Sequence, residues 1–293
     1  MLILISDAFD KSLPEKLKAF GEVTDDKSRL AEADVVLIRS KTKATREYID
    51  QAKNMKLIIR GGVGMDNIDR EYCKEKGIIA VNTPKSSSIA VAELAFALML
   101  STPCHIPFYD STMKKGEWMK NTKRTELYGK RLALLGMGNI ATKVAQRAQA
   151  FGMDVVAYDK YVKSSDYAVM MDLEDAVRDA DYISMHLPFT PETDRMISAS
   201  LISKMTHHPV LINTGRGKCI DEEAVAAALR SGDLAWYCTD VYTSEPPASD
   251  GPLFGCENVT FTPHVGANTV ENLLRIGEEV CQTIESLVKE GKI

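Results

Sequence analysis

The stretch RLALLGMGNIATKVAQRAQAFGMDVVAYD, residues 131–159, has the pattern of an apolar strand, a glycine turn, a helix and a second apolar strand that ends in an acid. Gly136 permits a tight turn after the first strand, and Gly138 lets the backbone approach a phosphate without a side chain in between. The following helix offers unpaired N–H groups and a partial positive charge. Asp159 lies 21 residues after Gly138, where an acid can bond ribose hydroxyls. The stretch predicts a dinucleotide site.

One position departs from the G-x-G-x-x-G pattern, because Ala141 stands where the third glycine is expected. Alanine is small enough for close packing of the helix on the strand and is an accepted variant. A bare G-x-G turn is often only structural, but here the flanking strands, the helix and the final acid are all present. We therefore expect the dinucleotide to contact Gly136, Gly138, Asn139, Ile140 and Asp159.

The acid also predicts which dinucleotide is bound. Asp159 would face the 2′-phosphate of NADP, which carries roughly two negative charges. At ~4 Å and an effective dielectric constant near 20, each such charge pair costs about 4 kcal/mol, an upper figure for an exposed site. The neighbouring Lys160 can offset part of this repulsion. The expected cofactor is therefore NAD(H).

Length and composition exclude several classes of protein. A chain of 293 residues suggests two domains, and its net charge of −5 without a basic run argues against nucleic acid as a partner. No apolar run is long enough to span a membrane, and residues 1–9 read as a first strand rather than a signal peptide. The six scattered cysteines indicate reduced thiols in a cytoplasmic protein, and the five histidines show no metal-binding spacing, so no metal is expected.

Short apolar segments alternate with helical ones in two series. The first series has candidate strands at 2–6, 35–39, 57–60 and 78–82, and the second at 132–135, 155–158, 182–186, 210–213, 236–240 and 259–262. Continuous apolar strands separated by helices predict parallel sheets covered on both faces, an α/β fold of two doubly wound domains. We expect one domain at 1–98 plus 268–293, interrupted by a dinucleotide domain at 99–267, with a cleft between them.

Two helices have a distinctive pattern. Residues 91–100, VAELAFALML, are apolar on too many sides for a surface helix, and Pro103 and Pro107 should end it. We expect this helix to be buried between the domains or against a partner subunit. The last helix, at 270–289, has apolar residues at helical spacing and should pack on the first domain.

Three loops that follow strands carry reactive side chains. INTGRGKCID contains Arg216, DVYTSEPP contains Asp240 and Glu245, and TPHVGANT contains His264. Reduction of a 2-keto acid needs a cation that holds the carboxylate and polarises the carbonyl, which suits arginine. It also needs a proton donor, which suits a histidine oriented by a carboxylate. Each residue alone is more often a surface, turn or structural residue, but their joint placement at strand ends favours hydride-transfer chemistry.

The chain resembles the D-isomer-specific 2-hydroxyacid dehydrogenases. The segments that carry the resemblance are RGGVGMDNID, VNTP, VAELA, LLGMGNIA, HLPFTPET, NTGRG, DVYTSEPP and TPHVG, in the family's order. The resemblance implies a flavodoxin-like substrate domain, a Rossmann NAD-binding domain, a homodimer, and Arg216, Glu245 and His264 as catalytic residues. It places the cofactor beside His186, Pro188, Thr193, Thr214 and Asp240. Backbone N–H groups near Val63 and Gly64 would bind the substrate carboxylate, helped by Arg60 unless that residue forms an interdomain ion pair.

Some positions depart from the family pattern. The loop after VNTP is KSSSIA, with Ser87 where an asparagine is frequent and Lys85 where glycine is common. Glu245 argues against formate dehydrogenase activity, for which the family uses glutamine. The chain continues for 29 residues after His264, so no C-terminal regulatory domain is expected. The resemblance implies a substrate of the glycerate, hydroxypyruvate or glyoxylate type. The alternatives are a phosphoglycerate dehydrogenase without a regulatory domain and a non-catalytic, NAD-sensing protein of the corepressor type.

Overall fold

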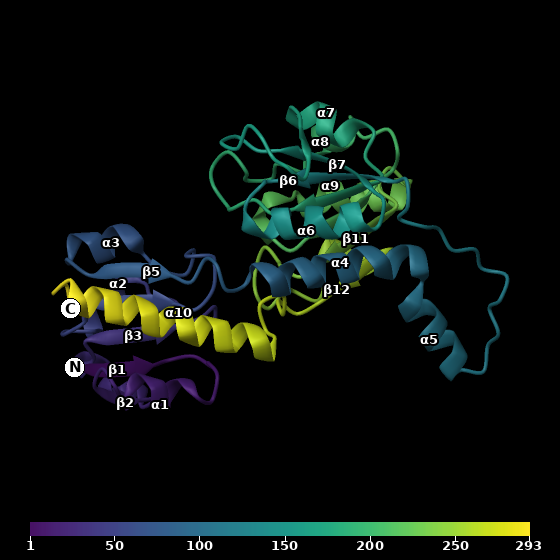
Figure 1. Ribbon diagram of the computed structural model, residues 1–293. Coiled ribbons are helices and arrows are strands. Elements are labelled where there is room, and N and C mark those ends of the chain that lie inside the picture. Colours follow the sequence, from purple (N-terminus) through teal and green to yellow (C-terminus); the bar gives the residue numbers. More distant parts are fainter. The chain divides into compact units, whose positions relative to one another are not determined.

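The computed structural model describes residues 1–293, which form two compact units (Figure 1). The first unit comprises Met1–Ala90 and Ala267–Ile293, and the second comprises Val91–Gly266. Each unit has one parallel β-sheet with helices on both faces, so the predicted α/β fold with two doubly wound domains is confirmed.

The first unit has a five-stranded parallel sheet in the order β2-β1-β3-β4-β5, which is the flavodoxin-like order. Its strands are β1 (Leu2–Ile5), β2 (Glu22–Thr24), β3 (Val35–Ile38), β4 (Leu57–Arg60) and β5 (Ile79–Asn82). Its helices are α1 (Leu13–Leu17), η1 (Lys27–Glu32), α2 (Arg46–Gln51), α3 (Arg70–Glu75) and α10 (Val270–Lys289). Ile276, Val280 and Ile284 of α10 are buried with Leu13 and Leu17 of α1, which confirms that the last helix packs on this domain.

The second unit has a seven-stranded parallel sheet in the order β12-β11-β10-β9-β6-β7-β8. When the strands are numbered in chain order from β6, this is the Rossmann order with one additional strand, β12, at an edge. Its strands are β6 (Arg131–Leu135), β7 (Asp154–Tyr158), β8 (Val169–Met170), β9 (Tyr182–Met185), β10 (Val210–Asn213), β11 (Trp236–Thr239) and β12 (Val259–Phe261).

Helices cover both faces of this second sheet. One buried cluster joins the sheet to α4 (Ser88–Cys104) and α6 (Asn139–Ala150). The other joins it to α7 (Leu173–Arg178), α8 (Ala199–Ile202) and α9 (Glu222–Ser231). The remaining helices are α5 (Ile106–Lys114), η2 (Gly217–Cys219) and η3 (Pro252–Gly255).

Helix starts follow from local side chains. The side chains of Thr45, Asp69, Asp221 and Thr269 accept backbone N–H groups at the first turns of α2, α3, α9 and α10. Each of these caps satisfies an N–H group that has no partner within its helix.

Two strands lack a recognisable signal in the sequence. β2 has three residues and β8 has two, and each lies at the edge of its sheet. Neither is long enough to produce an apolar run, so the sequence analysis gave one strand too few for each sheet.

Helix α4 requires two corrections. It runs from Ser88 to Cys104, so Pro103 lies inside the helix and does not end it. The N–H that Pro103 lacks would have bonded the carbonyl of Met99, and the Thr102 hydroxyl donates to that carbonyl instead (3.1 Å). Most of α4 is buried in the second unit, through residues such as Ala95 and Phe96. The compact first unit therefore ends at Ala90 rather than at the predicted residue 98.

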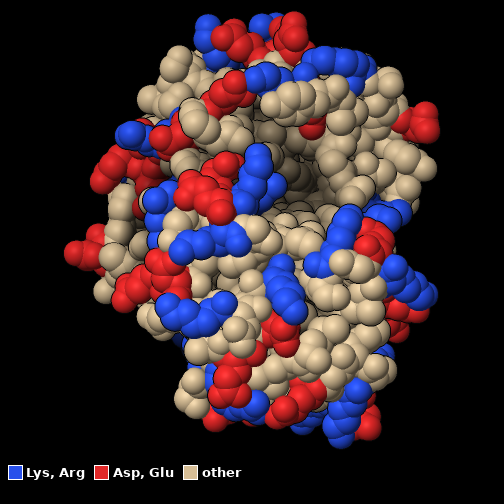
Figure 2. All heavy atoms as spheres, turned by 90° about the vertical axis from the view of Figure 1, so that its left-hand side faces the viewer, with Lys and Arg blue, Asp and Glu red and all other residues tan.

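No single helix is long and apolar enough to cross a membrane, although α4 and α5 pass that test as a pair bent by 60°. On the face in Figure 2, basic and acidic side chains are interspersed, in keeping with the small net charge of −5.

Candidate active site

The glycine turn between β6 and α6 has the geometry that the sequence predicts. Gly136 has a φ of +92°, and a Cβ there would lie 2.9 Å from the carbonyl oxygen of His186. A Cβ on Gly138 would meet nothing within 4 Å. Helix α6 starts at Asn139 and has no side-chain cap, and its second residue, Ile140, is half-buried. Its first N–H groups are thus available to an anion, and the turn fits a dinucleotide pyrophosphate.

Ala141 is completely buried in the cluster that joins α6 to Leu132 and Leu134 of β6. Close packing of helix on strand, the reason that small residues occur at this position, is therefore retained with alanine.

Asp159 directly follows β7 and is half-buried. Its Oδ2 atom accepts the N–H of Met137 (2.7 Å), and Oδ1 accepts those of Tyr161 (2.7 Å) and Val162 (3.0 Å). Burial raises the pKa of Asp159, but these three hydrogen bonds and nearby Lys163 together hold it below the ordinary value. Asp159 therefore stays charged at neutral pH and fixes the glycine turn.

The loop after β9 contains three predicted cofactor residues. The Nε2 atom of His186 lies 3.0 Å from the Ser184 hydroxyl, whereas its Nδ1 atom is buried without a partner. Burial lowers the pKa of His186 to about 4, so the ring is neutral at physiological pH. The Thr193 hydroxyl donates to the carbonyl of Pro188 (2.7 Å) and accepts the N–H of Thr190 (2.8 Å). Thr193 therefore shapes this loop.

Thr214, in the loop after β10, is buried, and its hydroxyl has no partner. Buried polar atoms are rarely left without a hydrogen bond. The hydroxyl of Thr214 and Nδ1 of His186 are therefore two atoms at the carboxyl edge of this sheet that suit a polar ligand.

Buried Asn213 at the end of β10 organises the loop that carries Arg216. Its Oδ1 atom accepts the N–H of Gly215 (3.0 Å), and its Nδ2 atom donates to the carbonyl of Arg216 (3.0 Å). Arg216 Nη1 also donates to the carbonyl of Gly215 (2.7 Å). A Cβ on the next residue, Gly217, would lie 2.0 Å from the carbonyl carbon of Tyr242. Glycine thus lets the Arg216 loop contact the backbone of the loop that carries Glu245.

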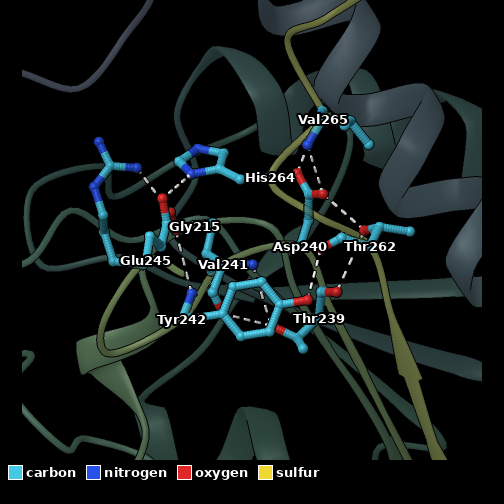
Figure 3. Close-up of polar contacts among 11 residues, drawn as sticks. Gly215, Thr239, Asp240, Val241, Tyr242, Glu245, Thr262, His264 and Val265 are labelled. Atoms are coloured by element: carbon cyan, nitrogen blue, oxygen red, sulfur yellow. Dashed lines mark hydrogen bonds and ion pairs between the residues drawn. The ribbon is translucent and has the colours of Figure 1, made fainter. Parts of the chain in front are cut away.

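Asp240 joins the loops after β11 and β12, as Figure 3 shows. It is 2% exposed, and its Oδ1 atom accepts the Thr262 hydroxyl (2.7 Å) and the N–H of Val265 (2.8 Å). Its Oδ2 atom accepts the N–H of Gly266 (2.8 Å). These bonds hold both sides of His264, whose φ of +53° is unusual for a residue with a side chain.

His264 and Glu245 form a direct pair (Figure 3), with 2.6 Å between His264 Nδ1 and Glu245 Oε2. Their side chains are 34% and 38% exposed, so a small molecule can reach them. Partial burial raises the pKa of Glu245. The hydrogen bond and charge of His264, the N–H of Tyr242 and the charge of Arg216 outweigh that effect, and the pKa lies below its ordinary value. Glu245 is thus a carboxylate that accepts Nδ1–H and leaves Nε2 of His264 free for proton exchange.

In the first unit, the predicted substrate residues lie at and after the end of β4. Arg60 is the last residue of that strand, and Val63, which is 37% exposed, and Gly64 follow in the loop. Gly62 has a φ of +139°, and a Cβ there would lie 1.6 Å from Arg60 Nη1. The loop is held by residues after β5, because Thr83 Oγ1 accepts the N–H of Gly62 (2.7 Å). The substrate role of this loop stays a prediction.

The loop of Lys85 and Ser87, which departs from the family pattern, lies in the same unit. Lys85 is exposed, whereas Ser87 is buried and its hydroxyl lies 3.2 Å from Asn272 Nδ2 of α10. Ser87 therefore anchors α10 within its own domain.

Sequence reasoning missed several residues that position the site. Asn213 and Thr262 lie inside the quoted motifs, but their neighbours Arg216 and His264 carried the interpretation. Tyr242 was missed as well, although its hydroxyl donates to the carbonyl of Thr262 (2.7 Å). For Asn213 and Thr262 the available signal was a hydrogen-bonding residue directly at a strand end, whereas Tyr242 lies three residues beyond β11 and had no such signal.

Arg39, in the first unit, is a further cation that the sequence analysis did not single out. It follows β3, and Ile38 before it pairs with Arg60 of β4. Its Nε atom is buried without a partner, and its Nη atoms make only long contacts, of 3.4 and 3.5 Å, with the carbonyls of Ala8 and Ala267. Burial lowers the pKa of this guanidinium despite nearby Asp7. Arg39 is therefore poorly satisfied at the same sheet edge as the Val63 loop.

Comparison with known proteins identifies the family. A family model for the NAD binding domain of D-isomer specific 2-hydroxyacid dehydrogenases matches residues 96–266. A hydroxypyruvate reductase of Thermotoga maritima is 42% identical over 89% of this chain and 86% of its own length. A D-3-phosphoglycerate dehydrogenase of Methanocaldococcus jannaschii is 39% identical over 98% of this chain, which spans only 57% of that relative.

Solved structures agree with this assignment. A D-lactate dehydrogenase of Aquifex aeolicus, solved with NAD and lactic acid, has a TM-score of 0.87 and 30% identity and covers 100% of this chain and 97% of its own. The glycine turn, the acid after β7 and the paired histidine and glutamate thus lie in a chain whose relatives share both sequence and fold. The chain belongs to the D-isomer specific 2-hydroxyacid dehydrogenase family, and its second unit is an NAD-binding domain.

Proposed function

We propose that the chain is an NAD(H)-dependent oxidoreductase that interconverts a small D-2-hydroxy acid and the corresponding 2-keto acid, of the glycerate/hydroxypyruvate or glyoxylate type. The observation that carries this proposal is the pair of His264 and Glu245, 2.6 Å apart, with the charge of Arg216 acting on Glu245. A proton donor, its orienting carboxylate and a cation are the groups that carbonyl reduction requires. Relatives named as a reductase and a dehydrogenase support the same reaction and do not favour the non-catalytic alternative.

Each residue of this set has a role in the proposed reaction. Bound NADH supplies the hydride that the keto carbon accepts. Arg216 binds and polarises the carbonyl, and His264 donates the Nε2 proton to the oxygen as its negative charge develops. Glu245 accepts Nδ1–H throughout, so it holds the ring in place and stabilises the imidazolium before transfer. In the reverse direction, neutral His264 takes the hydroxyl proton.

The other candidate residues have binding roles in this proposal. The glycine turn and the first residues of α6, from Gly136 to Ile140, hold the pyrophosphate. Asp159 accepts the ribose hydroxyls with lone pairs that its backbone bonds leave unused. The rest of the cofactor surface comprises His186, Pro188, Thr193, Thr214 and Asp240. In the first unit, Arg60 and the backbone of Val63 and Gly64 bind the substrate carboxylate. We add Arg39 as a second cation for an anionic substrate.

A substrate panel tests the function directly. NADH oxidation is followed with glyoxylate, hydroxypyruvate, pyruvate and a phosphorylated 2-keto acid. The variant His264→Ala should lose about a hundredfold or more in kcat, because a positioned general acid contributes on the order of 10²–10⁴-fold. Its Kd for NADH should change little. His207→Ala is the matched control, since that side chain is half exposed and its nearest carboxylate, Asp181, is 3.7 Å away.

Two outcomes contradict the proposal. If no 2-keto acid oxidises NADH although NADH binds, the chain is not an enzyme of this type. If His264→Ala loses NADH binding to the same degree as turnover, His264 has a structural role.

We also propose that the chain is cytoplasmic, which its six free cysteines support, and that it forms a homodimer. The proposed interface is α5 with the segment after it, not α4, because α4 is largely buried in its own unit. Ile106 and Trp118 in this region are 60% and 74% exposed, and Phe108, Met113 and Met119 are also exposed. Light scattering tests this: the wild type should be a dimer and Trp118→Glu a monomer, whereas a monomeric wild type would refute the interface.

A further inference from the structure

An ion pair joins the two loops on either side of the glycine turn. In the sheet, β6 lies between β7 and β9, so the loops that follow β7 and β9 flank the turn that follows β6. Lys160, in the first of these loops, places Nζ 2.5 and 2.6 Å from the two carboxylate oxygens of Glu192 in the second. Lys160 is the neighbour of Asp159, and Glu192 is the neighbour of Thr193.

This pair changes the charge next to Asp159. Lys160 is the cation beside the ribose-binding acid, where it could attract a 2′-phosphate. The ammonium group of Lys160 instead donates to the carboxylate of Glu192, and this hydrogen bond raises the pKa of Lys160. Lys163 also lies near, but its Nζ contacts only the carbonyl of Asp159, at 3.5 Å. The net charge of Asp159, Lys160 and Glu192 together is negative.

We propose that Glu192 is a specificity-determining residue that disfavours NADP(H), because it neutralises Lys160 and adds a second carboxylate beside Asp159. The inference rests on the proposed ribose-binding role of Asp159. Lys160 and Glu192 are 51% and 63% exposed, so the effect of each charge is screened by solvent. Two weak contributions act together in Glu192→Gln: one repulsive charge is lost and one attractive charge is released. We expect the ratio of Kd for NADPH to Kd for NADH to fall about tenfold.

The experiment measures Kd for NADH and NADPH by calorimetry, so that the readout does not depend on turnover. Four proteins form a cycle: wild type, Glu192→Gln, Lys160→Met and the double variant. The fall in the ratio should be larger for Glu192→Gln in the wild-type background than in the Lys160→Met background, where only the loss of the repulsive charge of Glu192 remains. Glu285→Gln is the matched control, because Glu285 forms an exposed ion pair of the same kind with Lys289 in α10 of the other unit.

The outcomes separate this inference from the proposed function. If wild-type protein binds neither nucleotide, both are overturned. If it binds NADH and the ratio in Glu192→Gln is unchanged, only the role of Glu192 is overturned. A ratio that falls equally with and without Lys160 overturns the release of Lys160 as the mechanism. Salt screens exposed charges, so the fall in the ratio should be smaller at raised ionic strength. A fall of the same size at low and raised ionic strength contradicts an electrostatic origin.

Discussion

Replacement of Gly217 by alanine tests whether two backbones in direct contact set the geometry of the proposed catalytic residues. A Cβ at this position would lie 2.0 Å from the carbonyl carbon of Tyr242, 2.3 Å from its oxygen and 2.6 Å from the nitrogen of Thr243. Raising the shortest of these to an ordinary contact of 3.4 Å requires the two loops to separate by about 1.4 Å. Arg216 precedes Gly217, and Glu245 follows Tyr242 by three residues, so this separation moves the proposed catalytic cation away from the proposed orienting carboxylate.

A misplacement of about 1 Å can reduce a rate on the order of 10²-fold. We therefore expect kcat/KM of Gly217→Ala to fall about a hundredfold with the best 2-keto acid. The free energy of unfolding should fall by only about 1–3 kcal/mol. The assay is NADH oxidation, combined with Kd for NADH and thermal unfolding. Gly255→Ala is the matched control, because a Cβ at Gly255 meets nothing within 4 Å. Retention of wild-type kcat/KM by a folded Gly217→Ala would refute the reasoning.

Three further changes have defined outcomes. Asp240→Asn turns an amide NH₂ toward backbone N–H groups of Val265 or Gly266, so we expect a loss of about 1–3 kcal/mol of stability and a fall in kcat, checked by thermal unfolding and kinetics. The pKa of Glu245 lies below its ordinary value of 4.5, so the stability that its carboxylate contributes is present above that pH and is lost as the pH falls through the lowered pKa. The difference in Tm between wild type and Glu245→Gln should therefore shrink over this range. A difference in Tm that stays constant would contradict this expectation. Arg39→Met should raise KM about tenfold with little change in kcat, as expected for a lost charged contact, and an unchanged KM would exclude Arg39 from substrate binding.

Much of the fold follows from patterns that occupy a full strand or helix. β3 and β6 are continuous apolar runs because both faces of their sheets are covered, and α10 has a repeat of buried residues, Ile276, Val280 and Ile284. The short edge strands β2 and β8 lack such a signal. They form only because β1 and β7, the strands that precede them in the chain, supply backbone partners, and such pairing leaves no apolar pattern in two or three residues.

The extent of α4 could not be read from its prolines. A proline interrupts a helix because one carbonyl loses its N–H partner. Here the hydroxyl of Thr102 serves the carbonyl of Met99, and the helix continues for one more residue. The domain boundary has a similar cause, since an apolar helix can pack equally well on either neighbouring sheet, and the partners of Ala95 and Phe96 lie in the second unit.

The two strand-end aspartates show why a candidate site residue is easier to select from the sequence than its role. Asp159 and Asp240 were both identified as ligand contacts, yet each directs both carboxylate oxygens to hydrogen bonds within the protein. An ionised carboxylate has about four acceptor positions, so such bonds fix a loop and still leave capacity for a ligand. Asp159 fixes the glycine turn, and Asp240 fixes the backbone around His264. The same property, a charged acceptor just beyond a buried strand, suits both loop geometry and the proposed ligand binding, and the sequence pattern alone does not separate these roles.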